Sequence, residues 1–246
     1  MNYNELNAHP RDQFVHFDEA DHTYTVNGKQ LISVTTLISK FFKEFDSEYW
    51  AQKKARERGV DVEVIKAEWE AKSKSARSKG TEMHAMIENY YKGGSINDVP
   101  ADIRTYFSHF AAAYQLEPYR SEWALYDEDF GIAGTLDFLE LKNGVFTLYD
   151  WKRSEKLIWH GEVDKVNRFG EKGLAPIENI DDTTYWHYAL QLSMYRYLLE
   201  KNYGISVSAG RLAVFHPRLD KYYVLEVPNL RSEVIAILNA WKATNQ

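Results

Sequence analysis

The sequence predicts an α/β fold in which a mixed β-sheet is flanked by helices. β-branched and aromatic residues concentrate in three stretches, residues 14–34, 119–151 and 209–227. The stretches between them show helical spacing of apolar residues, bounded by residues that begin and end helices. With 246 residues, 44% of them hydrophobic, the chain is long and apolar enough to bury a sizeable core.

The N-terminal third predicts a β-hairpin followed by helices. Asn27-Gly28 separates two β-rich runs and is a strong hairpin signal. Helical patterns follow at Thr35–Phe45, Ser47–Arg58 and Asp61–Tyr91. Asp46 is expected to cap the second helix and Gly59 to end it. Gly80 predicts a break within the third helix.

The remaining elements alternate between helices and strands. They are a helix over Asp102–Tyr114, strands between Tyr119 and Trp151, a helix over Thr183–Tyr203, strands around Ala209–His216 and Tyr222–Val227, and a helix over Arg231–Trp241. No repeat or Pro/Gly-rich linker divides the chain, so we expect one domain over residues 1–246. Within it, residues 1–79 would form the N-terminal hairpin and a basic helical arm, and residues 80–246 the core.

The composition excludes several classes of protein. The chain has no cysteine, which excludes a disulfide framework, a thiolate zinc site and a cysteine-bound iron–sulfur cluster. No apolar run approaches the ~18 residues of a membrane span, and no signal-peptide pattern follows Met1. We therefore expect a cytoplasmic protein without a membrane partner. The absence of a G-x-x-x-x-G-K-[ST] phosphate loop excludes a P-loop motor.

Charge is unevenly distributed along the chain. The formal net charge of −6 argues, taken alone, against a nucleic-acid partner. Residues 51–80, however, carry nine basic and five acidic side chains, whereas residues 81–151 carry four basic and twelve acidic ones. This distribution is compatible with a solvated helix face followed by ordinary surface. It is also compatible with a phosphate-binding arm beside a carboxylate metal site.

A predicted hairpin over residues 134–152 brings two carboxylates together. Asn143-Gly144 fits the centre of a two-residue type I′ turn, whose register places Asp137 opposite Asp150. Opposed like charges destabilise a strand pair, and a divalent cation such as Mg²⁺ or Mn²⁺ would neutralise them. Lys152 lies two residues beyond Asp150 and therefore projects from the same face. The alternative is a hairpin at the rim of the sheet with ordinary surface charges.

Four motifs carry a resemblance to a known superfamily. Asp137 and, after twelve intervening residues, Asp150-Trp151-Lys152 resemble the D…(D/E)-x-K signature of PD-(D/E)XK nucleases. Three more motifs resemble the RecB-like exonuclease branch in the expected order: Gly80-Thr-Glu-Met-His84, Gly134-Thr-Leu-Asp137 and Gln191-Leu-Ser-Met-Tyr195. Residues 33–36 and 45–51 are also similar to phage exonucleases and the mitochondrial genome maintenance exonuclease.

The resemblance implies a restriction-endonuclease-like core, with residues 80–246 as the catalytic part. It implies a metal-dependent DNA exonuclease that hydrolyses phosphodiester bonds in single strands or at duplex ends. The expected setting is phage or bacterial recombination, replication or repair, with proteins of those processes as further candidate partners. The expected cofactor is Mg²⁺ or Mn²⁺. The absence of cysteine excludes the iron–sulfur cluster of some relatives.

The resemblance also implies metal ligands. These are Asp137, Asp150, the carbonyl group of Trp151, and His84. Glu88 lies one helical turn after His84 and would orient that imidazole or contact a hydrated ion. The alternative for Glu88 is a solvated side chain.

Further roles follow from the same motifs. Lys152 would position or deprotonate the attacking water, and Gln191 and Tyr195, one helical turn apart, would contact phosphate and orient the lysine. Glu122 would brace the site or bind a second ion. Phosphate contacts would come from four basic residues, Lys72, Lys74, Arg77 and Lys79.

Two other functions remain open at this point. A nuclease-fold module could bind DNA or a protein without cleaving it, although the intact set of Asp137, Asp150 and Lys152 argues against that. A structure-specific endonuclease would use the same chemistry and would differ from an exonuclease in needing no DNA end.

Overall fold

The structure is a computed structural model that describes residues 2–18 and 21–244. The strands are β1 Val15–Asp18, β2 Thr23–Val26, β3 Lys29–Ser33, β4 Pro118–Asp127, β5 Ile132–Lys142, β6 Val145–Lys152, β7 Ile158–Trp159, β8 Glu162–Val163, β9 Val207–Val214 and β10 Tyr223–Val227. The helices are α1 Tyr3–Leu6, α2 Val34–Ser39, α3 Ser47–Arg58, α4 Val62–Tyr91, α5 Arg104–Tyr114, α6 Thr184–Asn202 and α7 Arg231–Thr244. Short 3₁₀ helices are η1 Pro10–Phe14, η2 Ile96–Asp98 and η3 Glu155–Leu157.

The central sheet has eight strands in the order β1-β2-β3-β5-β6-β9-β10, with β4 paired to β5. Pairs β3–β5 and β6–β9 are parallel, and the other pairs are antiparallel. The predicted mixed α/β fold class is therefore confirmed. The N-terminal hairpin is also confirmed: Val26 pairs with Lys29, and Asn27 and Gly28 between them both have positive φ.

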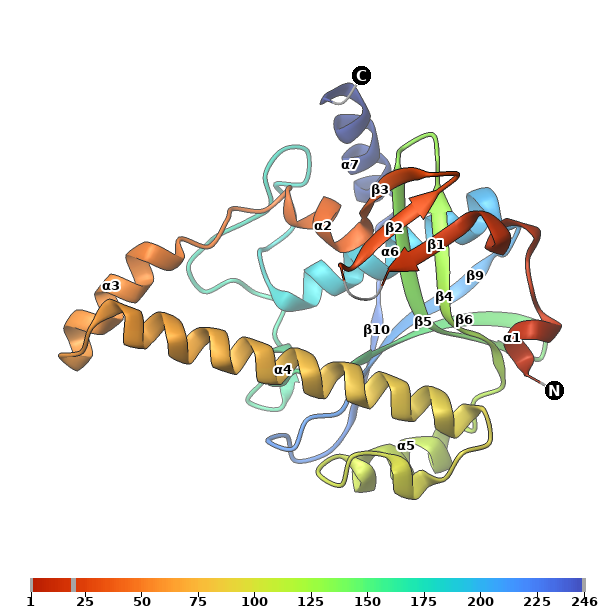
Figure 1. The fold of residues 1–246 in the computed structure, drawn as a ribbon, viewed down its shortest axis with the longest axis horizontal. Coiled ribbons are helices and arrows are strands. Elements are labelled where there is room, and N and C mark those ends of the chain that lie inside the picture. Colours follow the sequence, from red (N-terminus) through yellow and green to blue (C-terminus); the bar gives the residue numbers. More distant parts are fainter. Residues whose placement is uncertain (1, 19–20, 245–246) are drawn as a thin grey trace.

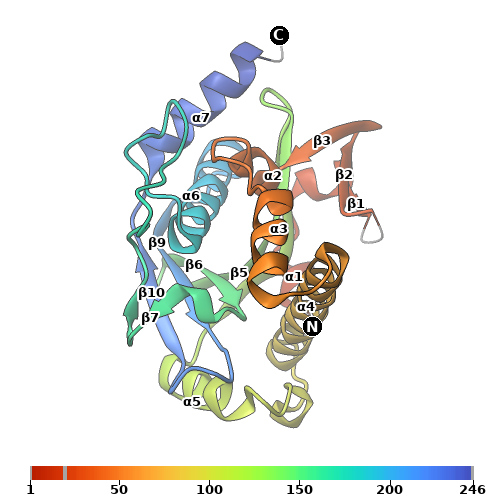
Figure 2. The same ribbon diagram turned by 90° about the vertical axis from the view of Figure 1, so that its left-hand side faces the viewer.

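Helices cover both faces of this sheet. On one face, α2, α6 and α7 bury a large apolar cluster that includes Leu136 and Leu139. On the other face, α5 and the C-terminal half of α4 pack on a cluster that includes Phe138 and Trp151. Figure 2 shows α6 and α7 together, with α4 and α5 apart from them. Trp151 therefore points into packing, as predicted, whereas its neighbours Asp150 and Lys152 point towards α6.

Strand β5 changes its orientation at Asp137. In a regular strand Leu136 and Phe138 would face the same side, but here they belong to the clusters on opposite faces. The neighbouring strand β4 is irregular at the same level. Ser121 pairs with Phe138 and Trp123 with Leu136, and the residue between them, Glu122, has a φ of 44°.

Helix α4 crosses most of the width of the molecule (Figure 1). Its first turns pack against α3 through Ala51, Ala55 and Ile65, and its last turns enter the core. Residues 70–79 between these ends are exposed. No helix among residues 2–18 and 21–244 is long and apolar enough to cross a membrane.

Two of the N-terminal helices differ from the sequence-based expectation in their extent. Gly80 does not break the third helix, since α4 is continuous over Val62–Tyr91. An interior glycine costs only about 1 kcal/mol, which packing at both ends of the helix offsets. The helix expected over Thr35–Phe45 ends at Ser39.

The ends of α3 agree with the prediction. The Asp46 side chain accepts a hydrogen bond from the Tyr49 backbone N–H at 2.9 Å, and Gly59 ends the helix with a φ of 65°.

Two glycine-to-alanine substitutions should change stability in opposite directions. At Gly134, a Cβ would lie 2.8 Å from Tyr195 Cε1 and 3.2 Å from Val34 Cγ2, so we expect Gly134→Ala to destabilise by about 1–3 kcal/mol. At Gly80, a Cβ would meet nothing within 4 Å, so Gly80→Ala should stabilise by about 0.5–1 kcal/mol. Urea unfolding of both variants and the wild type measures this. A destabilised Gly80→Ala would contradict the continuous helix.

Candidate metal centre

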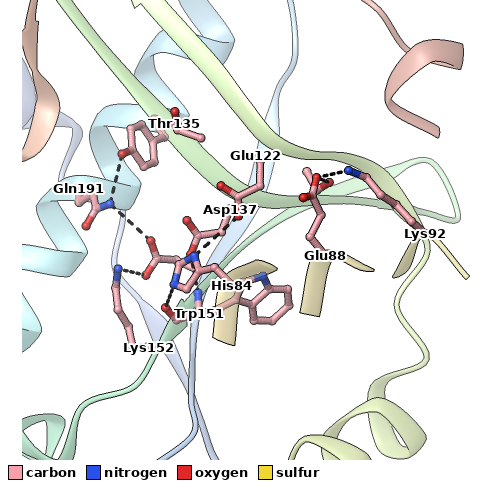
Figure 3. A network of polar contacts seen from close by, with 12 residues as sticks. His84, Glu88, Lys92, Glu122, Thr135, Asp137, Trp151, Lys152 and Gln191 are labelled. Carbon is pink, nitrogen blue, oxygen red and sulfur yellow. Dashed lines mark hydrogen bonds and ion pairs between the residues drawn. The ribbon is translucent and has the colours of Figure 1, made fainter. Parts of the chain in front are cut away.

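Three potential metal ligands converge from three different elements. His84 on α4, Glu122 on β4 and Asp137 on β5 each offer one ligand atom, and these atoms lie within 4.8 Å of one another. Figure 3 shows the three side chains pointing towards a common point. Helix α4 brings His84 to the sheet beside Glu122, which has a left-handed backbone, and Asp137, where β5 changes its orientation.

Hydrogen bonding orients the imidazole of His84. Its Nε2 lies 2.9 Å from the carbonyl oxygen of Trp151, which can only accept, so Nε2 carries the hydrogen. The other nitrogen, Nδ1, faces Asp137 Oδ2 at 3.6 Å and Glu122 Oε1 at 3.7 Å. Histidines that bind metals commonly donate their second N–H to a carbonyl group in this way.

The neighbouring carboxylates raise the pKa of His84. Burial lowers the pKa of the imidazole, but the charge of Asp137 and the contact with Glu122 outweigh burial and raise that pKa from 6.5 to about 9. Asp137 Oδ2 in turn accepts a hydrogen bond of 2.7 Å from the backbone N–H of Trp151. Burial raises the pKa of Asp137, and the charges of His84 and Lys152 oppose this rise.

Asp150 and Lys152 form a buried ion pair beside this cluster. Asp150 is 1% exposed, and its Oδ2 lies 2.6 Å from Lys152 Nζ without the angles of a hydrogen bond. Burial and the neighbouring Asp137 raise the pKa of Asp150 to about 6. Burial lowers the pKa of Lys152, but Asp150 and Asp137 raise it above its ordinary value, so Lys152 is held as a cation.

Gln191 and Tyr195 extend the network onto α6. The Gln191 side-chain amide donates to Asp150 Oδ1 at 3.5 Å and to Tyr195 Oη at 3.2 Å. Both residues are buried, and the close approach of Gly134 leaves room for the Tyr195 ring. Gln191 thus contacts Asp150, whereas the sequence-based interpretation directed this pair towards phosphate and the lysine.

Other predicted site residues have different partners. Glu88 does not orient His84. Its Oε1 lies 2.6 Å from Lys92 Nζ and accepts a hydrogen bond from Ser121 Oγ at 3.0 Å (Figure 3). The Trp151 carbonyl group is already bonded to His84. Asp150 is not part of the three-residue ligand cluster.

The four basic residues predicted to bind phosphate lie N-terminal to His84 on α4. All are exposed: Lys72, Lys74, Arg77 and Lys79.

Sequence reasoning missed one residue at the site. The ring of Tyr188 lies 4.2 Å from Lys152 Nζ, at a distance typical of a cation–π contact. Tyr188 is three residues before Gln191, so helical spacing places both on one face of α6. This three-residue spacing from Gln191 is the sequence signal that could have identified Tyr188.

The donor set fits a divalent cation. It combines one imidazole nitrogen with two carboxylate oxygens, a set that suits Mn²⁺ and, through its oxygens, Mg²⁺. The distances from Nδ1 to the carboxylates are too long for hydrogen bonds, so the ligand atoms do not satisfy one another directly.

Comparisons with known proteins give distant structural similarities. No family model matches the chain, and no curated protein matches its sequence. Among solved structures, one from Eubacterium rectale described as a "putative exonuclease" is 14% identical with a TM-score of 0.48, covering 88% of this chain and 82% of its own. The structure of SSO0001 is also 14% identical, with a TM-score of 0.36, covering 87% and 76%. Similarity at this level assigns neither family nor activity.

Calorimetric titration with Mn²⁺ tests the cluster. We expect Mn²⁺ to bind the wild type and both variants to bind it at least about tenfold more weakly. Asp137→Asn removes the negative charge of a ligand, and His84→Ala removes the imidazole nitrogen. Glu88→Gln is the matched control and should bind Mn²⁺ as the wild type does, since Glu88 pairs with Lys92. Unchanged Mn²⁺ affinity in Asp137→Asn would exclude this centre.

Proposed function

We propose that the protein hydrolyses phosphodiester bonds in DNA with a divalent cation, as an exonuclease acting on single strands or duplex ends. One observation carries the proposal. The ligand cluster of His84, Glu122 and Asp137 lies beside the buried pair of Asp150 and Lys152. Carboxylates, an imidazole and a lysine around one point form a set suited to a phosphate group and a cation. The resemblance of the four motifs to RecB-like exonucleases supports the choice of DNA and of end-dependent cleavage.

The cation would be Mg²⁺ or Mn²⁺, held by His84, Glu122 and Asp137. When bound, such a cation polarises a phosphoryl oxygen and lowers the pKa of water. The Trp151 carbonyl group keeps His84 Nδ1 directed at the ligand position through the hydrogen bond from Nε2. The backbone N–H of Trp151 holds Asp137 in place, so one peptide segment orients two ligands.

Lys152 supplies positive charge for the phosphate. Its ammonium group is fixed between Asp150 and the ring of Tyr188. Asp150 is fixed in turn by the amide of Gln191. An ammonium group that is already fixed needs little rearrangement when negative charge develops on the phosphate. It can also orient the attacking water.

The exposed part of α4 would bind the DNA backbone. Residues 1–79 would comprise the N-terminal hairpin and this basic helical arm, and residues 80–246 the catalytic core. The four basic residues of the arm lie on the helix that also carries His84. We further propose a role in phage or bacterial recombination, replication or repair, in the cytoplasm.

Cleavage assays with end-labelled DNA test the chemistry. Linear DNA should be degraded with Mg²⁺ or Mn²⁺ and remain intact with EDTA. Lys152→Ala should lower the rate by about 100-fold or more, because the positive charge at the phosphate is lost. Asp150→Ala should lower it by a similar factor, because the ammonium group of Lys152 is no longer fixed. Lys29→Ala, which removes an exposed lysine on β3, should cleave at the wild-type rate.

The substrate separates the alternatives. Closed circular DNA should resist the enzyme, whereas its cleavage would indicate an endonuclease. Linear DNA that stays intact with every cation, while still being bound, would indicate a binding module.

The salt dependence of binding tests the arm. Replacing all four basic residues by alanine should reduce the slope of log affinity against log salt by up to about 2.8 for single strands, because each phosphate contact contributes ~0.7. The matched control exchanges lysine and arginine at the same four positions, which preserves charge and should preserve the slope. Filter binding in EDTA measures both. An unchanged slope in the alanine variant would place the DNA elsewhere.

A further inference from the structure

A large cavity lies next to Lys152. It has a volume of about 1010 Å³ and is formed by the segment between β6 and α6, the first turns of α6, and the β9–β10 connection. The same segment passes beside α6 in both ribbon views (Figures 1 and 2). Tyr188 belongs to both places, because it lines the cavity and its ring lies 4.2 Å from Lys152 Nζ. The cavity thus adjoins the candidate metal centre across one aromatic ring.

Exposed aromatic side chains line this cavity. Trp159 is 52% exposed and Phe169 is 87% exposed, and Tyr223 contributes a further ring. Val166, on the same segment, is 65% exposed. Large apolar side chains gathered at one cavity with this exposure are typical of a binding site.

The charges around the cavity do not favour a phosphate group. Arg168 pairs with Asp164 at 2.9 Å, and Arg218 pairs with Glu155 at 3.0 Å. Lysine and arginine are outnumbered by acidic residues in the lining, which has Lys156, Arg168 and Arg218 against Glu155, Asp164, Asp182 and Asp220. A ligand here should therefore be flat and uncharged, with polar edges that these side chains can meet.

We propose that this cavity binds the unpaired nucleobase of the nucleotide next to the scissile phosphate. The base stacks on Phe169 and on the face of the Trp159 ring opposite the Arg168 guanidinium, which lies 4.0 Å from the ring centre. This inference rests on the proposed function and sharpens its substrate class to single-stranded DNA or frayed ends. In this arrangement the scissile phosphate lies at Lys152, and the base lies in the cavity on the other side of the Tyr188 ring. Tyr188 thus separates the charged phosphate site from the aromatic base site. Stacking accepts every base, so the cavity selects unpaired strands without selecting sequence.

Single-stranded oligonucleotides with 2-aminopurine at successive positions from either end test this inference. In EDTA, stacking should quench the fluorescence strongly at one position and weakly elsewhere. Trp159→Ala combined with Phe169→Ala should abolish this positional quenching and weaken binding about tenfold. Trp159→Phe should retain it. Phe14→Ala is the matched control, since Phe14 is 45% exposed and lies outside the cavity.

Cleavage of the same oligonucleotides with Mn²⁺ separates this inference from the proposed function. If the wild type cleaves them but no position is quenched, or the double variant quenches normally, the base site is overturned and the nuclease stands. If nothing is cleaved but quenching still depends on Trp159, the nuclease is overturned and the base site stands. Absence of both cleavage and quenching overturns both, and would leave the cavity to a ligand other than DNA.

Discussion

The arrangement of this protein depends on the burial of negative charge. Asp137 and Asp150 are strand residues with buried side chains. Keeping an isolated carboxylate ionised in such a place costs free energy. Each has a cationic neighbour, His84 for Asp137 and Lys152 for Asp150. Helix α4 places His84 beside Asp137, and helix α6 places the amide of Gln191 beside Asp150. Both helices thus supply groups that stabilise a buried carboxylate.

A local irregularity gives the two carboxylates different surroundings. At Asp137 the strand turns its side chains from one face to the other, and the carboxylate accepts the N–H of Trp151. Glu122 stands beside it with a left-handed backbone, which costs about 1–2 kcal/mol for a residue other than glycine. Asp137 is thereby directed at His84, while Asp150 remains with the lysine.

The turn at Asn143-Gly144 shows how far sequence reasoning reaches. Its predicted register holds from Lys142–Val145 to Phe138–Tyr149, because a two-residue turn fixes the pairing that follows it. The ladder stops one step before Asp137 and Asp150, beside Glu122 of β4, whose backbone is left-handed and which lies outside the hairpin. The resemblance of the Gly80–His84 motif to RecB-like exonucleases placed His84 at the site. It did not predict that Glu88 contacts Lys92 and Ser121. Local signals predicted the elements, and tertiary contacts decided which side chains meet.

Because α4 is continuous, it fixes the distance between its exposed basic residues and the candidate metal centre. A helix of 30 residues is a stiff rod of about 45 Å, and Gly80 does not interrupt it. Lys72 and Lys79 precede His84 by roughly 18 Å and 8 Å along its axis. If DNA is held along this rod, the basic residues and the metal centre are separated by a fixed span of about 8–18 Å. A DNA segment shorter than that span would reach the metal centre without contacting the basic residues of α4.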